Sequence, residues 1–102
     1  MKLFIDDERY PTNDEFAIVR SYEEAVDFMT KNGCPEFISF DHDLGEGMNG
    51  FDIAKWIIDT DLDNNQTFLP QSFDFYVHSM NTIGAKNIKD ILAKYIEFRK
   101  LA

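Results

Sequence analysis

The chain has little of the chemistry on which secreted and membrane proteins depend. Its 102 residues include a single cysteine, Cys34, so no disulfide can form within it. It has no run of about 18 apolar residues of the kind that crosses a bilayer, and its opening residues meet Asp6 and Asp7 too soon for a signal peptide. We therefore expect a cytoplasmic protein that makes no contact with membranes.

Basic residues are also scarce. Ten Lys and Arg stand against nineteen Asp and Glu, which gives a formal net charge of -9. Residues 1–82 hold five basic and seventeen acidic residues, whereas residues 83–102 hold five basic and two acidic ones. Phosphate contacts supply most of the non-specific affinity for duplex nucleic acid, so this acidic body excludes a duplex as a partner. It remains compatible with a small phosphorylated ligand or nucleotide where a cation lies between the phosphate and the carboxylates.

Apolar residues are sufficient for one compact domain over residues 1–102, since they make up 44% of the chain and include ten Phe. Short apolar runs predict four strands, and capping residues before apolar positions at helical spacing predict three helices. The strands are expected at Lys2–Ile5, Phe16–Arg20, Glu36–Phe40 and Phe73–Val77, the helices after Ser21, Asn49 and Asn81 or Thr82, and a polar loop at Asp61–Pro70.

Helices separate the second, third and fourth strands, which requires parallel pairing through right-handed crossovers. We predict an open α/β sheet of about four strands in the order 2-1-3-4, with helices on both faces. The connection from Asp6 to Glu15 has room for a short helical turn. An uncovered edge beyond the fourth strand would favour pairing with a second copy, and so a homodimer.

Three of the predicted strands end in polar residues. In an open parallel sheet, ligands bind outside the carboxyl ends of the strands, so these residues are expected to share one site. Carboxylates that lie this close repel one another and need a proton or a cation. Oxygen ligands suit Mg²⁺, Mn²⁺ or Ca²⁺, and an imidazole extends the range towards Fe²⁺ or Zn²⁺. The segments are Asp6, Asp7, Glu8 and Arg9, then Asp41, His42 and Asp43, then His78, Ser79, Met80 and Asn81.

These segments resemble the receiver domain of two-component response regulators. Asp6 and Asp7 match the acidic pair that binds Mg²⁺ in that family, Asp41 matches its phosphoacceptor, and Ser79 matches the hydroxyl at the end of strand four. The resemblance implies a receiver-like, flavodoxin-like fold. The fifth strand of a receiver, with the Lys that ends it, has no counterpart here, and the two His are additional.

The motifs are more specifically similar to a divergent receiver-like family proposed to process cyclic phosphates. Residues 3–11 (LFIDDERYP), 39–45 (SFDHDLG) and 78–81 (HSMN) match its three motifs in order. The resemblance implies a metal-dependent phosphoesterase, a hydrolase of a cyclic nucleotide or of a cyclic-phosphate end, that uses Mg²⁺ or Mn²⁺. The expected metal ligands are Asp6, Asp7, Asp41 and Asp43; the catalytic residues are His42, His78 and Asp41; and the phosphate-binding residues are Arg9, Ser79 and Asn81.

Two other functions remain open. A receiver-like domain could act without catalysis, as a Mg²⁺-binding switch phosphorylated on Asp41 or as a protein-interaction module, although the missing Lys counts against the switch. The acidic surface could also mimic nucleic acid for a protein partner. Mimicry needs charge spread over a surface, however, and here carboxylates gather at the strand ends.

Overall fold

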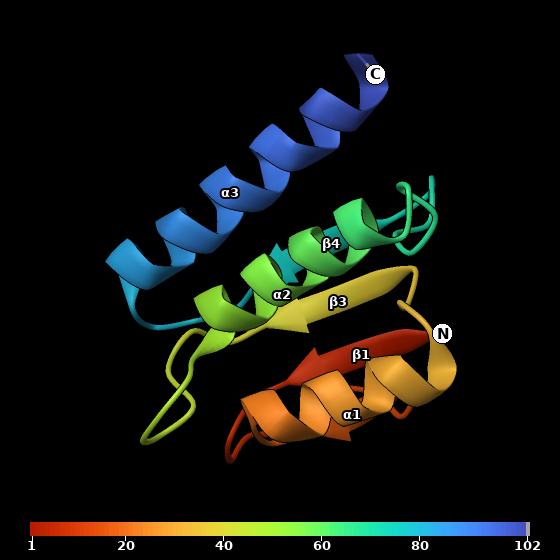
Figure 1. The fold of residues 1–102 in the computed structure, drawn as a ribbon. Helices are drawn as coiled ribbons and strands as arrows, with labels where there is room; N and C mark the ends of the chain where they lie inside the picture. The colour runs from red at the N-terminus through yellow and green to blue at the C-terminus, as the bar shows by residue number, and fades with distance from the viewer. Residues whose placement is uncertain (102) are drawn as a thin grey trace.

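The structure is a computed structural model that describes residues 1–101. Four parallel strands form one sheet in the order β2-β1-β3-β4, as predicted (Figure 1). No helix within these residues is long and apolar enough to cross a membrane. The strands are β1 (Lys2–Ile5), β2 (Phe16–Val19), β3 (Phe37–Phe40) and β4 (Asp74–Val77), and the helices are α1 (Tyr22–Asn32), α2 (Gly50–Asp63) and α3 (Thr82–Leu101).

The register of the sheet brings the carboxyl ends of the strands level. Lys2 of β1 lies opposite Phe16 and Phe37, and Phe37 lies opposite Asp74. Backbone hydrogen bonds continue one residue beyond the paired strands: the N–H of Asp41 donates to Ile5 O at 2.9 Å, and that of His78 donates to Phe40 O at 2.9 Å. The first residues after β1, β3 and β4 therefore stand side by side.

One face of the sheet packs into the core. Every second strand residue points to this face, because side chains alternate along a strand. Helix α3 contributes Ile88, Leu92 and Tyr95 to this core, and all three are buried. The fully buried apolar side chains that join the sheet to the helices include Leu3, Ile5, Ile38, Phe40, Ala25, Ile53, Ile57, Ile88 and Leu92.

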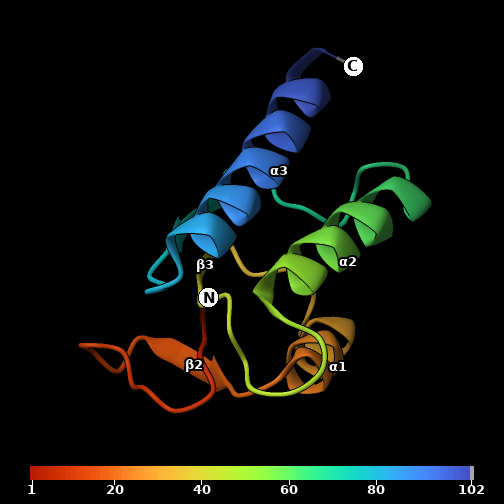
Figure 2. The same cartoon turned by 90° about the vertical axis from the view of Figure 1, so that its left-hand side faces the viewer.

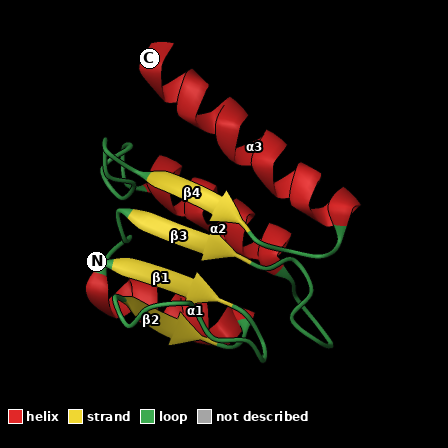
Figure 3. Ribbon diagram, turned by 180° about the vertical axis from the view of Figure 1, so that it is seen from behind, coloured by secondary structure: helices red, strands yellow, loops and turns green. Residues whose placement is uncertain are grey.

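The prediction of helices on both faces was wrong. Helices α1 and α2 cover one face and α3 packs against α2 and β4, while within residues 1–101 the opposite face carries the β1–β2 connection and no helix (Figures 2 and 3). The crossovers from β2 to β3 and from β3 to β4 run the same way across the sheet, so right-handedness places α1 and α2 on one side. The connection that runs the other way, residues 6–15, contains turns and no helix.

The expected polar loop from Asp61 begins later, because α2 continues to Asp63. Asp61 is fully buried and accepts hydrogen bonds from the Tyr95 hydroxyl at 2.5 Å and from the Leu69 N–H at 2.7 Å. Arg99 Nε lies 3.4 Å from the same carboxylate. Burial, together with the Asp61 carboxylate, raises the pKa of Tyr95. This buried group ties α2, the loop that follows it and α3 together at the end of the sheet remote from the polar strand ends.

Candidate metal centre

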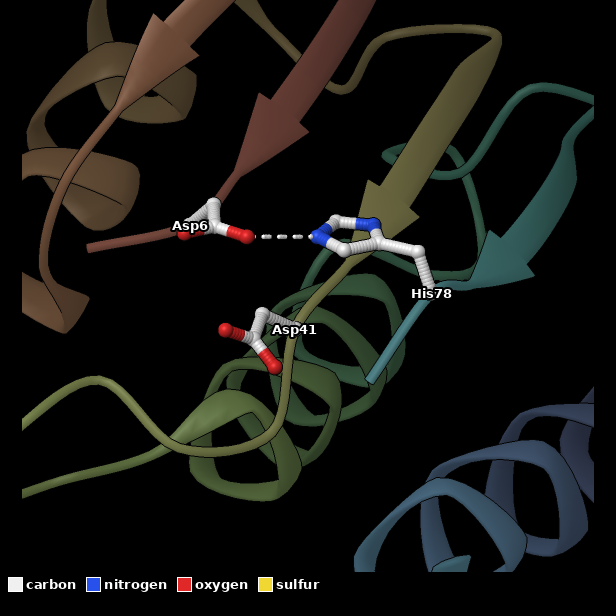
Figure 4. A group of neighbouring side chains, drawn as sticks. All are labelled: Asp6, Asp41 and His78. Carbon is white, nitrogen blue, oxygen red and sulfur yellow. Dashed lines mark hydrogen bonds and ion pairs between the residues drawn. The ribbon is translucent and has the colours of Figure 1, made fainter. Parts of the chain in front are cut away.

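Three ligand-type side chains meet at the carboxyl edge of the sheet. One ligand atom from each of Asp6, Asp41 and His78 lies within 4.8 Å of the others (Figure 4). Asp6 is 0% exposed and Asp41 is 6% exposed, and His78 is half-buried. Each residue immediately follows a strand, so the level strand ends determine their proximity.

The alternation of the strands also determines where these three side chains point. Along β1, Lys2, Phe4 and then Asp6 occupy successive positions on the face without helices. Asp41 continues the same face from Ser39, and His78 continues it from Tyr76. Because side chains two residues apart share a face, the three groups converge from neighbouring strands.

Arg9 supplies positive charge to the two carboxylates. Its Nε lies 2.9 Å from Asp6 Oδ2 and its Nη2 lies 3.5 Å from Asp41 Oδ2. The other oxygen of Asp6 accepts the backbone N–H groups of Glu8 and Arg9, at 3.0 and 2.8 Å. Burial raises the pKa of Asp6, but these backbone bonds, the His78 hydrogen bond and the Arg9 charge outweigh it, so the pKa lies below 3.8. Asp6 is therefore held as a carboxylate.

Three contacts determine the orientation of the His78 ring. Nε2 lies 3.0 Å from Asp6 Oδ2, and Nδ1 lies 2.7 Å from the hydroxyl of Ser39. The ring also stacks on Phe4, with centroids 4.5 Å apart and an interplanar angle of 1°. Because a carboxylate only accepts, Nε2 carries the proton in this arrangement and the Ser39 hydroxyl donates to Nδ1. Sequence reasoning missed Ser39; the signal was a hydroxyl in an apolar strand, two residues before Asp41.

A second polar group contains four more of the predicted residues. His42 Nδ1 lies 2.7 Å from Asp43 Oδ1, and Asn81 Nδ2 donates to the same oxygen at 3.3 Å. These hydrogen bonds, with that of His42 the larger, lower the pKa of Asp43. Asn81 Oδ1 accepts the Gly84 N–H at 2.9 Å and so caps α3, while the Ser79 hydroxyl accepts the Asn81 N–H at 3.1 Å. The structure therefore places Asp43 with His42.

Asp7 and Asp43 lie outside the group formed by Asp6, Asp41 and His78. Asp7 is exposed and its carboxylate lies towards Gly45 of the β3–α2 loop. Asp43 is also exposed and is engaged as described above. A direct role for these two carboxylates in metal binding stays a prediction. His78, which was expected to be catalytic and not a metal ligand, lies in the group with Asp6 and Asp41.

Two glycines allow the helices to close on residues 41 and 42. The Gly50 N–H donates to His42 O at 2.8 Å, and a Cβ at Gly50 would overlap the Asp41 carbonyl. A Cβ at Gly84 would overlap the imidazole of His42. Sequence reasoning gave neither glycine a role. The signal was a glycine in the first turn of a helix, where a better helix former is expected unless close packing forbids it.

The sequence profile of the cyclic-phosphate processing Receiver domain matches residues 1–94. The chain belongs to this family. No curated protein and no solved structure matches the chain significantly. In this receiver domain the acidic residues that the resemblance implied, Asp6 and Asp41, follow β1 and β3, and His78 adds an imidazole after β4.

The donor set of this receiver domain fits a divalent cation. Two carboxylates and one imidazole nitrogen approach from three strands, and the buried carboxylates already require positive charge, which Arg9 provides. An Asp-Asp-His cluster of this kind could hold a metal ion, because its donor atoms are of the types that bind divalent cations.

Proposed function

We propose that the protein is a metal-dependent phosphoesterase that hydrolyses a cyclic phosphate. One observation carries the proposal: Asp6, Asp41 and His78 converge within 4.8 Å, and Arg9 contacts both carboxylates. Membership of a cyclic-phosphate processing family supports the choice of substrate class. The cluster would thus provide a cation site, and Arg9 would provide beside it a guanidinium suited to phosphate oxygens.

Asp6, Asp41 and His78 would hold the metal. Mg²⁺ and Mn²⁺ both suit carboxylates, and the imidazole nitrogen favours Mn²⁺ of the two. When bound, the ion would lower the pKa of a water molecule and polarise the phosphoryl oxygens. With a metal on Nε2, the imidazole proton would sit on Nδ1 and be donated to the Ser39 hydroxyl, so Ser39 would act as the outer partner that orients the His78 ring, as is normal for ligating imidazoles.

Arg9 would bind the phosphate. A guanidinium presents several N–H donors in a plane and can contact two phosphate oxygens at once. Its side chain is 44% exposed, so one side of it remains open while it contacts Asp6 and Asp41. It would neutralise charge on the substrate beside the proposed cation site.

His42 would transfer the proton. The Nδ1–H of His42 would donate its hydrogen bond to Asp43, which leaves the lone pair on Nε2 of His42 to accept a proton from water. Once protonated, Nε2 would donate that proton to the leaving oxygen. Asn81 holds the Asp43 carboxylate and so positions this pair. From the sequence, both His42 and His78 were expected to be catalytic; with His78 at the metal, His42 would carry the proton transfer.

The test is a hydrolysis screen with the metal-free protein and added Mg²⁺, Mn²⁺ or Zn²⁺. The substrates are 2′,3′- and 3′,5′-cyclic mononucleotides and an oligonucleotide with a 2′,3′-cyclic phosphate end. We expect ring opening that requires a divalent metal and is lost in Asp41→Asn but kept in Asp59→Asn, an exposed carboxylate on α2. Equal rates with and without metal, or in Asp41→Asn and wild type, would contradict the proposal.

A second function is favoured by the position of Asp41 at the end of β3 beside Asp6, which is where the receiver resemblance places a phosphoacceptor. In that case the domain is a phosphorylated switch. Incubation with acetyl phosphate or phosphoramidate and Mg²⁺ distinguishes the two. A phosphoryl adduct on Asp41, seen by mass spectrometry and absent in Asp41→Asn, together with silence in the hydrolysis screen, would establish the switch.

A further inference from the structure

The face of the sheet without helices carries an aromatic groove. Figure 3 looks onto this face. A cavity of about 390 Å³ lies between the β1–β2 connection, at Tyr10 and Pro11, and the side chain of Tyr76 on β4. Phe37 and Ser39 of β3 also line it. The volume falls in the range of about 300–1,000 Å³ typical of sites for small organic ligands.

The groove presents aromatic rings that the core does not use. Tyr10 is 75% exposed and Tyr76 is 60% exposed, and Phe16 and Phe37 are half-buried. Phe16 contacts Phe4 and Phe37 edge to face, with centroids 5.9 and 6.1 Å apart, so aromatic rings run across three strands. Exposed apolar surface gathered in this way on a soluble domain marks a binding site.

The sheet register places the groove one row of side chains below the metal centre. Asp6, Asp41 and His78 form the first row, and the row below them contains Phe4, Ser39 and Tyr76. Two residues along a strand advance about 6.6 Å, so these rows are separated by a distance that a single pentose ring can bridge.

Two residues belong to both sites. His78 lines the groove, stacks on Phe4 inside it and contacts Asp6 through Nε2 at 3.0 Å. Arg9 lines the groove and pairs with Asp6 and Asp41. A molecule whose phosphate lies at the metal centre therefore has its remaining part directed along the aromatic groove.

We infer that the groove binds the nucleobase of a nucleoside cyclic phosphate or its product, an inference that rests on the proposed function. A base is planar and stacks on aromatic side chains in a way that tolerates any of the four bases. Tyr76 from β4 and Tyr10 from the β1–β2 connection provide such rings, and the Arg20 guanidinium stacks over the Tyr10 ring at 4.6 Å. The substrate would thus be a nucleotide, and a cyclic phosphate without a base would be bound poorly.

A second copy of the chain is a less suitable occupant of this face. Each chain carries a formal charge of -9, and two such chains repel. Self-association would also leave unexplained why Arg9 and His78 connect the groove to the metal centre. The nucleobase accounts for both the aromatic rings and that connection.

The test measures binding separately from hydrolysis. Two ligands are titrated calorimetrically into the Mn²⁺-loaded protein. Adenosine 3′-monophosphate has no cyclic phosphate to open, and glycerol 2-phosphate has no base. We expect the nucleotide to bind at least about tenfold more tightly. Tyr76→Ala should weaken nucleotide binding about 5- to 150-fold, the range for loss of one base stack, and leave glycerol 2-phosphate unaffected.

Two variants and one further titrant sharpen this result. Tyr76→Phe keeps the ring and should retain the affinity for the nucleotide, and Phe98→Ala, which removes an exposed ring on α3 outside the groove, should also bind normally. An oligoribonucleotide with a 3′-phosphate is the third titrant; it supports the inference whether it binds more tightly than the mononucleotide, as an RNA end would, or equally.

Equal affinities for the nucleotide and glycerol 2-phosphate would overturn the inference even if cyclic phosphates are hydrolysed. Identical nucleotide binding by Tyr76→Ala and Phe98→Ala would overturn it as well. So would a wild-type dimer that Tyr76→Ala dissociates in sedimentation, because the face would then be an interface between copies. Tyr76-dependent nucleotide binding without any hydrolysis would instead uphold the groove and remove the proposed function.

Discussion

Asp41→Asn tests the metal centre most directly, because it removes one of three ligands without removing volume. At a metal concentration about 100 times the Kd, binding to the folded protein alone adds about 2.7 kcal/mol to the free energy of unfolding. For a domain of about 100 residues this corresponds to a rise in Tm of about 10 °C or more. We expect that rise for the wild type with Mn²⁺ and most of it to be lost in Asp41→Asn.

Without metal, the same substitution should change stability little. Loss of the contact between Arg9 and Asp41, at 3.5 Å with Arg9 44% exposed, costs less than about 1 kcal/mol, because solvent screens a partly exposed ion pair. Relief of repulsion between Asp41 and Asp6 acts in the opposite direction. The Tm in EDTA should therefore stay within about 5 °C of the wild type.

The assay is scanning calorimetry of wild type, Asp41→Asn and the exposed control Asp59→Asn, each in EDTA and in a series of Mn²⁺ and Mg²⁺ concentrations. The control should respond to metal as the wild type does. If the wild-type Tm does not move with any divalent ion, or if Asp41→Asn keeps the full rise, the reasoning from the Asp6, Asp41 and His78 geometry is refuted.

Three further predictions follow from the contacts at this edge. Arg9→Gln should tighten Mn²⁺ binding about fivefold in calorimetric titration, because it removes a positive charge that competes with the cation and is worth about 1 kcal/mol near the surface. The same variant should still lower kcat/KM, because phosphate binding is weakened. Weaker Mn²⁺ binding by the variant would contradict this prediction. Gly84→Ala should lower activity about tenfold or more in the hydrolysis assay, because the added methyl group displaces the His42 ring. In urea unfolding the overlap should lower the free energy of unfolding by about 1–3 kcal/mol, partly offset by about 1 kcal/mol from the better helix propensity of Ala. A net gain in stability would count against the packing described. The folded-state pKa of Asp6 is lowered, so its contribution to stability is present above the unfolded pKa of 3.8 and is lost as the pH falls through the lower folded value. In EDTA the wild type should therefore lose its advantage over Asp6→Asn in urea unfolding as the pH falls below 3.8, and a constant difference would be evidence against a carboxylate held by these hydrogen bonds.

Most of the strand pattern and the location of the site could be predicted from the chain alone. Strand order followed from the separation of strands by helices, which limits the pairing to parallel neighbours. Because the polar residues after β1, β3 and β4 come directly after short apolar runs, their meeting at one edge followed from that order. Position along the chain was enough to place Asp6 and Asp41 together.

The correct ligand group could not be chosen in the same way. Asp7 and Asp43 are as acidic and as near in sequence as Asp6 and Asp41, but the alternation beyond the strand ends points them elsewhere. His78 joins Asp6 only because β4 lies level with β3 in the register, and its ring is oriented by Ser39 and Phe4 from other strands. Which of these side chains join the ligand group therefore depends on a difference of one residue in strand register, or on the side of the sheet to which a side chain points.

The sequence by itself determined which segments become strands and helices, since apolar spacing and caps act over a few neighbouring residues. Only the tertiary structure decided that all three helices leave one sheet face uncovered, that Gly84 admits the His42 ring, and that Arg9 reaches two carboxylates from different strands. The physical reason is that these features depend on which side of the sheet each connection crosses and on close packing between segments distant in the chain. Neither quantity is expressed in the local pattern of residue types.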